Sequence, residues 1–160
     1  VSELEIVLVE DDPNDAELIM RALKKHNLAN KIVLLKDGTE ALDFMFRQGK
    51  YADTPLSVKP KVVLLDLKLP KVNGIEVLRK VKADDRTKKI PIVVLSSSAE
   101  NKDVRDAYTL GVNSYVTKPI KFEDFSKAVT DLGMYWMLLN KPVPPCKGKP
   151  ADTNGSIEAK

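Results

Sequence analysis

The sequence has few of the residues on which many catalytic and structural sites depend. Among its 160 residues are one cysteine, Cys146, and one histidine, His26. A single cysteine excludes a disulfide within the chain and a metal site with several thiolate ligands. A single histidine excludes a zinc site built on two histidines and leaves none to spare for a Ser-His-Asp triad. We expect His26 to face solvent in the last turn of a helix.

Long apolar runs and a strong net charge are also missing. No apolar segment approaches the roughly 20 residues that a membrane-spanning helix needs, and no signal-peptide pattern opens the chain. The 26 basic and 23 acidic side chains leave a net charge of +3, which is too small to indicate nucleic-acid binding without a basic patch. We therefore expect a cytoplasmic protein that binds neither membrane nor nucleic acid.

The chain instead shows a regular alternation of short apolar runs and amphipathic helical patterns. Asp12 and Pro13 are typical of a helix start, as N-cap and first helical residue, and Gly111 is typical of a helix end. Five strand–helix pairs indicate an α/β domain with a parallel sheet and right-handed crossovers. The five predicted strands cover residues 6–9, 32–35, 62–65, 92–95 and 114–117.

The predicted domain ends near residue 140. The last helix is expected from Phe122 to Leu139, and its end, 133–139, is too apolar for one buried stripe. Residues 141–160 hold four prolines, two glycines and an isolated Ile157, so we expect residues 1–140 to fold and 141–160 to form a disordered tail. Residues 47–60 form a polar segment that reads as an inserted loop.

Polar side chains follow four of the five predicted strands. Glu10-Asp11 follow the first, Asp66 the third, Ser96 the fourth and Lys118-Pro119 the fifth. Because sites in parallel sheets form at the carboxyl ends of the strands, we expect these groups to meet at one edge. Each has an ordinary explanation as a cap, turn or loop residue, but their joint placement at successive strand ends favours a site.

The chemistry of these groups suits phosphoryl transfer. Neighbouring carboxylates oppose each other's ionisation, and a Mg²⁺ ion held by carboxylate and phosphate oxygens relieves that conflict. A carboxylate beside the ion can act as a nucleophile and form an aspartyl phosphate, while Lys118 and the hydroxyl of Ser96 stabilise the transferred group. No Walker loop, Gly-x-Gly-x-x-Gly or His-Glu-x-x-His motif is present, so nucleotide and zinc sites lack their residues.

These motifs resemble those of the receiver domains of two-component response regulators. The resemblance spans residues 5–132 and implies a doubly wound (βα)5, flavodoxin-like fold whose five-stranded parallel sheet has the order 2-1-3-4-5. The motifs that carry it are Val-Glu-Asp-Asp at 9–12, Leu-Asp-Leu-Lys-Leu-Pro at 65–70, Asn73-Gly74, Leu95-Ser96-Ser97 after Pro91, and Tyr-Val-Thr-Lys-Pro at 115–119.

The resemblance also implies a role for each site residue. The expected phosphoacceptor is Asp66. The expected Mg²⁺ ligands are Asp11, Asp66, the backbone carbonyl of Lys68 and, through water, Glu10. The expected phosphate-binding and switch residues are Ser96, Lys118 and Tyr115, with Ser97 and Pro119 as secondary positions. The peptide between Lys118 and Pro119 is often cis in this family.

The function implied is that of a single-domain response regulator with no attached effector. A sensor histidine kinase would transfer a phosphoryl group from a phosphohistidine to Asp66 in a Mg²⁺-dependent reaction, which would switch a protein-interaction surface. Such a chain is a phosphoacceptor rather than an enzyme, apart from its own phosphorylation and dephosphorylation. A homodimer would form through the face of the fourth helix and fifth strand or through the C-terminal helix extension.

The loop at 47–60 and the apolar last helix are similar to those of stand-alone receivers that serve phytochrome-type histidine kinases. A general stand-alone receiver without a phytochrome is the alternative. Two other functions stay open at this point. A hydrolase of the haloacid dehalogenase type would need a nucleophilic aspartate after the first strand and a second aspartate two residues further on. This sequence has Glu10-Asp11-Asp12 there, and Glu10 is a poor match for the nucleophile. A phosphorylation-independent binding domain would not need the intact acceptor, metal and lysine positions.

Overall fold

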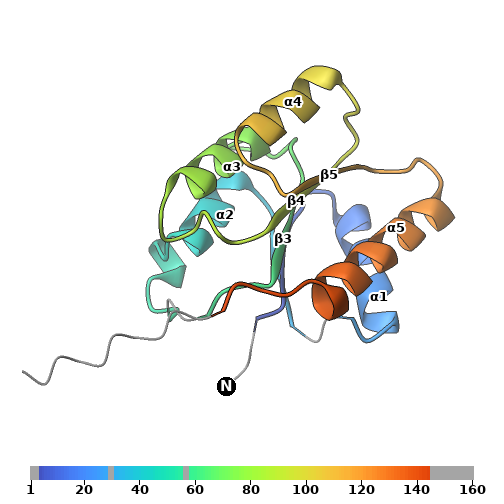
Figure 1. The fold of residues 1–160 in the computed structure, drawn as a ribbon, viewed down its shortest axis with the longest axis horizontal. Coiled ribbons are helices and arrows are strands. Elements are labelled where there is room, and N and C mark those ends of the chain that lie inside the picture. The colour runs from blue at the N-terminus through green and yellow to red at the C-terminus, as the bar shows by residue number, and fades with distance from the viewer. Residues whose placement is uncertain (1–3, 29–30, 56–57, 145–160) are drawn as a thin grey trace, which may run out of the picture.

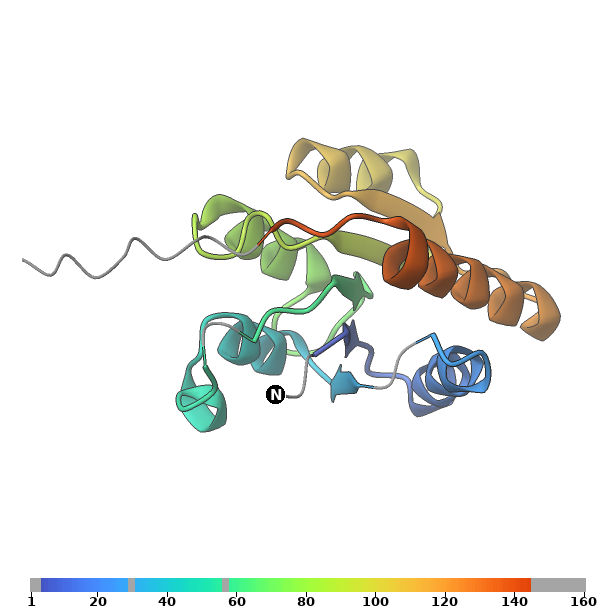
Figure 2. The same ribbon diagram turned by 60° about the horizontal axis from the view of Figure 1, so that its bottom comes forward.

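The computed structural model describes residues 4–28, 31–55 and 58–144, which form a five-stranded parallel sheet between two layers of helices (Figure 1, Figure 2). The strands are β1 (Ile6–Val9), β2 (Ile32–Leu35), β3 (Val62–Leu65), β4 (Ile92–Ser96) and β5 (Ser114–Thr117). They lie in the order β2-β1-β3-β4-β5, and each pairs in parallel with its neighbours. This confirms the fold class and strand order predicted from the sequence.

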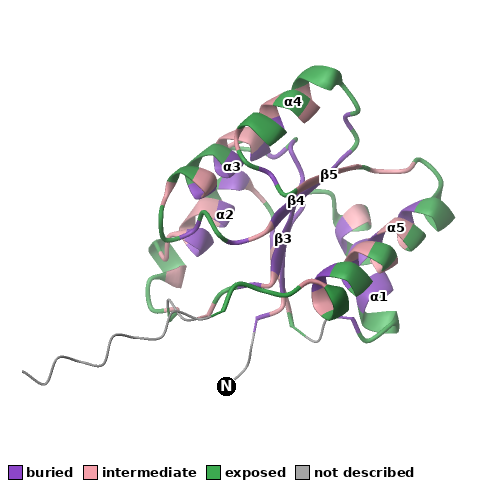
Figure 3. Ribbon diagram, viewed as in Figure 1, coloured by how far each residue is buried: buried purple, intermediate pink, exposed green. Residues whose placement is uncertain are grey.

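The strands feed two hydrophobic cores because successive side chains of a strand point to opposite faces. Ile6 and Leu8 contact the core on one face of the sheet, whereas Val7 and Val9 contact the core on the other face. The three central strands are buried throughout, and the edge strands β2 and β5 are only partly buried (Figure 3). The helices are α1 (Pro13–Lys25), α2 (Gly38–Met45), α3 (Gly74–Ala83), α4 (Asn101–Thr109) and α5 (Phe122–Met134).

Short polar side chains begin the helices beside the carboxyl edge of the sheet. Asp12 is the N-cap of α1, as predicted, and its Oδ1 accepts hydrogen bonds from the backbone N–H groups of Asn14 and Asp15. Asp37 and Asn73 cap α2 and α3 in the same way. The α4 helix ends before Gly111, which has a φ of +99° and so fills the left-handed position that the sequence assigned to it.

The last helix differs from its predicted course. It was expected to be α-helical to Leu139, but α5 ends at Met134 and continues as a π-helical turn, η2 (Tyr135–Leu139). The wider turn is closed by the Asn140 N–H, which donates to the Tyr135 carbonyl at 2.7 Å. It places Trp136 in the core under α1 while Leu138 and Leu139 remain exposed. An unbroken α-helical pattern does not describe this segment.

Two further expectations concern the loop and the tail. Residues 47–60, predicted as a loop, contain a short 3₁₀ helix, η1 (Gly49–Tyr51), whose Tyr51 ring packs edge-on against Phe44 with centroids 5.1 Å apart. Of the tail expected at 141–160, residues 141–144 form no helix or strand, and residues 145–160, with Cys146, lie outside the described residues. None of the described helices is long and apolar enough to cross a membrane.

Candidate functional site

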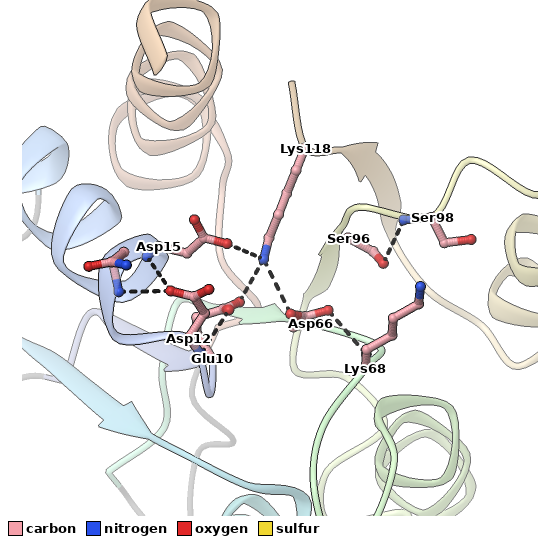
Figure 4. A network of polar contacts seen from close by, with 9 residues as sticks. Glu10, Asp12, Asp15, Asp66, Lys68, Ser96, Ser98 and Lys118 are labelled. Atoms are coloured by element: carbon pink, nitrogen blue, oxygen red, sulfur yellow. Dashed lines mark hydrogen bonds and ion pairs between the residues drawn. The ribbon is translucent and has the colours of Figure 1, made fainter. Parts of the chain in front are cut away.

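The polar groups predicted to meet do meet at the carboxyl edge of the sheet (Figure 4). Lys118 follows β5, and its Nζ lies 3.0 Å from Glu10 Oε2 and 3.2 Å from Asp66 Oδ2, which follow β1 and β3. The hydrogen bonding between neighbouring strands continues one residue beyond their ends. The Asp66 N–H donates to the Val9 carbonyl at 3.0 Å, and the Lys118 N–H donates to the Ser96 carbonyl at 2.7 Å. Residues far apart in the sequence therefore form one pocket.

Three carboxylates of the pocket could share a cation. Glu10, Asp11 and Asp66 each offer an oxygen within 4.8 Å of the others. Glu10 is 2% exposed and Asp66 is 7% exposed, whereas Asp11 is open to solvent. Two buried carboxylates beside one exposed carboxylate suit a hard divalent cation that keeps part of its water shell. Mg²⁺ usually binds to proteins in this way. The donor set therefore fits the metal expected from the sequence.

The chain beyond Asp66 holds its side chain in place. The backbone N–H of Lys68 donates to Asp66 Oδ1 at 3.1 Å, and Asp66 Oδ2 faces Lys118. Gly74 lies against the other side of this segment, so closely that a Cβ at Gly74 would sit 2.2 Å from the Asp66 carbonyl oxygen. The two carboxylate oxygens of Asp66 thus have distinct environments, one in the loop and one in the ionic pocket.

Burial and charge alter the protonation of two pocket residues. Burial and the neighbouring Asp66 raise the pKa of Glu10 to about 8, against the opposing effect of Lys118. Burial acts to lower the pKa of Lys118, but its hydrogen bonds and charge interactions with the surrounding acids prevail and raise that pKa. Lys118 therefore remains an ammonium group, and Glu10 takes up a proton more readily than an ordinary glutamate in the absence of a cation.

Asp15 also belongs to this pocket, although it was not among the site residues predicted from the sequence. Its Oδ2 lies 3.0 Å from Lys118 Nζ, and its side chain is 34% exposed. The site was predicted from the polar residues at strand ends, whereas Asp15 lies in the first turn of α1. The available signal was the Asp12 cap, which fixes the start of α1 and directs its first turn toward the same edge.

Ser96 and Tyr115, predicted as switch residues, are joined through Ser98. The Ser98 N–H donates to Ser96 Oγ at 3.2 Å, and the Tyr115 hydroxyl donates to the Ser98 carbonyl at 2.7 Å. Ser98 Oγ in turn donates to Asp103 Oδ2 in the first turn of α4 at 2.5 Å. Ser98 is buried, and its contacts with Tyr115 and Asp103 were not indicated by the sequence. The structure thus connects Ser96 to both α4 and β5.

The secondary positions contribute less to the pocket. Ser97 is exposed and Pro119 is partly buried. The described residues contain no cis peptide bond, so the expectation of a cis peptide before Pro119 is wrong for this structure. The trans form is the intrinsically preferred state of a peptide bond before proline, and in it Lys118 already reaches its carboxylate partners.

Comparisons with known proteins give a consistent result. The model of the family described as "Response regulator receiver domain" matches residues 6–130. The probable methanogenesis regulatory protein FilR2 of Methanothrix harundinacea is 43% identical over 136 residues, which cover 85% of each chain. Response regulator Rcp1 of Synechocystis sp. is 39% identical over 132 residues, which cover 82% of this chain and 88% of Rcp1.

Solved structures agree with this similarity. The Mn²⁺-bound form of Rcp1 superposes with a TM-score of 0.82 and 36% identity, covering 88% of this chain and 99% of Rcp1. The phosphorylated cyanobacterial phytochrome response regulator RcpA superposes with a TM-score of 0.83 and 35% identity, covering 89% of this chain and all of RcpA.

Proposed function

The chain belongs to the family of response regulator receiver domains, and we propose that Asp66 is its phosphoacceptor. The observation that carries this proposal is the position of Asp66, a buried carboxylate between the acids after β1 and the ammonium of Lys118. A carboxylate oxygen of Asp66 attacks the phosphorus of a phosphohistidine, the P–N bond breaks, and its electron pair stays on the imidazole. The product is an aspartyl phosphate.

The pocket residues would divide the remaining work. Asp11, Asp66 and the backbone carbonyl of Lys68 would hold Mg²⁺ directly, and Glu10 would hold it through water. When bound, the ion would neutralise part of the charge on the phosphoryl oxygens. Lys118 would pair with another of these oxygens, and Ser96 would turn its hydroxyl toward them as a hydrogen-bond donor.

The same step would alter the surface made by α4 and β5. A phosphoryl group adds about −1.5 to −2 charges and three acceptor oxygens. If Ser96 Oγ turns toward it, the Ser98 N–H loses its acceptor, and Ser98 also holds Tyr115 and Asp103. A local change at Asp66 would therefore shift the population of arrangements at the α4–β5 face, which is the proposed output.

The proposed phosphodonor is a sensor histidine kinase of the phytochrome type. The support is the similarity to RcpA, which is described as a phytochrome response regulator. Two and four residues after Lys118, Ile120 is fully exposed and Phe122 is 69% exposed. A protein that brings a phosphohistidine to Asp66 would cover both apolar side chains. Glutamate at Ile120 should slow transfer from the kinase but not from a small phosphodonor.

A second copy of the chain is the other proposed partner, through the C-terminal extension. Four large apolar side chains of α5 and η2 are exposed there: Met134, Tyr135, Leu138 and Leu139. At the α4–β5 face, Tyr108 is the exposed large apolar residue of the described chain. Sedimentation of a Leu138→Ser, Leu139→Ser double variant should show a smaller species than the wild type. An unchanged mass would remove this dimer surface.

The function is tested by incubating the chain with Mg²⁺ and acetyl phosphate and measuring its intact mass. We expect one added phosphate in the presence of Mg²⁺, and none when the incubation contains a chelator in place of Mg²⁺. The hydrolase alternative predicts steady turnover of a generic phosphate ester, whereas a receiver should show next to none. A chain that neither gains phosphate nor responds to Mg²⁺ would contradict the proposal.

A further inference from the structure

Lys118 is held by three carboxylates, two from residues 10–15, where β1 leads into α1, and one from the end of β3. Its Nζ lies 3.0 Å from Glu10, 3.0 Å from Asp15 and 3.2 Å from Asp66. A lysine ammonium has three N–H donors, so each of them has one carboxylate partner. Figure 4 shows Nζ between Asp15, which extends from α1, and Asp66, which follows β3.

Two of these three partners belong to the cation-binding group, and Asp15 does not. The group consists of Glu10, Asp11 and Asp66. Under the proposed function, a bound cation draws on the oxygens of Glu10 and Asp66, and esterification of Asp66 removes the charge that Lys118 now faces. Among the described partners of Lys118, Asp15 is the carboxylate that keeps both its charge and its contact.

The position of Asp15 is fixed by its helix. Its backbone N–H donates to Asp12 Oδ1 at 3.1 Å, and it lies in the capped first turn of α1. Lys118, in contrast, reaches the pocket through a flexible four-carbon stem. An error of about 1 Å in the place of a charged group can slow a reaction by as much as a hundredfold. An anchor on a rigid helix would limit such errors.

We propose that Asp15 is a positioning residue that fixes the Lys118 ammonium where the phosphoryl oxygens arrive. It acts through the salt bridge and does not itself touch the phosphoryl group. This inference rests on the proposed phosphoryl transfer to Asp66. It gives a role in that transfer to Asp15, which lies on α1 and not at the end of a strand.

Asp15→Asn and Asp12→Asn form a matched pair for the test. Both remove one negative charge at the start of α1, and asparagine caps a helix about as well as aspartate. Of the two aspartates, Asp15 forms the ion pair with Lys118, whereas Asp12 caps the helix. With the full chain, saturating Mg²⁺ and acetyl phosphate, we expect the phosphorylation rate constant of Asp15→Asn to fall about tenfold. That of Asp12→Asn should stay within about twofold of the wild type, because its charge is exposed and screened.

A second readout follows Lys118 itself. The ¹⁵Nζ resonance of Lys118, recorded without phosphodonor, should move in Asp15→Asn and stay in place in Asp12→Asn. Calorimetric titration with Mg²⁺ should give both variants similar dissociation constants, because both lose the same charge. The longer carboxylate of Asp15→Glu should restore part of the lost rate.

The outcomes separate this inference from the proposed function. Equal phosphorylation rates in the two asparagine variants, an unmoved Lys118 resonance, or an Asp15→Glu chain as slow as Asp15→Asn would each overturn the role of Asp15. A wild-type chain that takes up no phosphate would contradict the proposed function instead. If Asp15→Asn fails to give a native spectrum, the rate of Asp15→Glu decides the question.

Discussion

The hydroxyl of Tyr115 donates a hydrogen bond to the backbone carbonyl of Ser98 at 2.7 Å. Tyr115 belongs to β5, and Ser98 lies in the loop after β4. The backbone N–H of Ser98 donates a hydrogen bond to the hydroxyl of Ser96. Ser96, the proposed sensor of the phosphoryl group, and Tyr115, at the α4–β5 face, thus both form a hydrogen bond with the backbone of Ser98. The arrangement offers a short physical route from Asp66 to the surface.

Tyr115→Phe should weaken this connection and leave the chemistry intact. The variant keeps the ring and loses one hydrogen bond, worth about 1 kcal/mol of stability. Phosphate uptake at Asp66 should stay close to that of the wild type, because the hydroxyl contacts Ser98 and not Asp66. The amide resonances of α4 should respond less to phosphorylation than in the wild type. An α4 response equal to that of the wild type would rule out this route.

Glu10 should make both stability and Mg²⁺ binding depend on pH. Its pKa is about 8 in the folded chain and 4.5 as an ordinary glutamate, so the folded state holds the proton more tightly than the unfolded state. Its contribution to stability is complete below pH 4.5 and is lost as the pH rises to about 8. Mg²⁺ should bind more tightly over the same rise, because the proton no longer competes.

The measurement compares urea unfolding of the wild type with Glu10→Gln at several pH values without Mg²⁺. The difference in unfolding free energy should change steadily between pH 5 and 8, roughly the interval between the two pKa values. Glu17→Gln, a change at an exposed glutamate of α1, is the control and should show no such trend. Parallel curves for Glu10→Gln and the wild type would mean that Glu10 titrates normally.

Gly74→Ala should damage the fold and the site together. A Cβ at this position would lie 2.2 Å from the Asp66 carbonyl oxygen and 2.6 Å from Leu67 Cα, and both are backbone atoms that cannot turn aside. We expect a loss of about 3 kcal/mol in unfolding free energy, at the upper end of typical overpacking costs. The phosphorylation rate should fall too, because the Asp66 backbone must move. Unchanged stability and rate in Gly74→Ala would contradict this packing.

Lys82 should be important for stability although it is remote from the pocket. Its Nζ donates to the carbonyls of Lys88 and Ile90 and to Asn113 Oδ1, and so connects α3 with the segments before β4 and β5. Lys82→Met should lower the free energy of unfolding by about 2 kcal/mol, because it removes the donor of the Lys88 and Ile90 carbonyls. Asn113 Oδ1 would keep its hydrogen bond from the Ile92 N–H. Lys80→Met, at an exposed position of the same helix, should change it by less than about 0.5 kcal/mol. Equal changes in unfolding free energy for the two variants, measured by chemical denaturation, would show that the Lys82 hydrogen bonds do not stabilise the fold.

Much of the fold and of the pocket could be predicted because both follow from short-range patterns. Apolar runs of four residues predicted β1 to β4, and β5, Ser-Tyr-Val-Thr, was predicted from its place in the strand–helix alternation. The polar residue after a strand has its place fixed by the parallel sheet. Asp66 and Lys118 were therefore placed correctly with no knowledge of the contacts between them. The Asp12 cap followed from the same local chemistry.

The residues that were missed depend on contacts across the fold. Asp15 joins the pocket only because the fold brings Lys118, 103 residues further along the sequence, to the first turn of α1. Ser98 becomes a junction only when Tyr115 and Asp103 approach it from other elements. The π-helical turn at Tyr135–Leu139 follows the burial of Trp136 in the core, and a sequence period does not report such packing.

The central claim is most directly tested by the site of phosphorylation. Asp66→Asn and Asp37→Asn, the second an N-cap that asparagine can replace, should be incubated with Mg²⁺ and acetyl phosphate and analysed by intact mass. The account predicts one added phosphate on the wild type and on Asp37→Asn, and none on Asp66→Asn. An Asp66→Asn chain that still gains phosphate would contradict it.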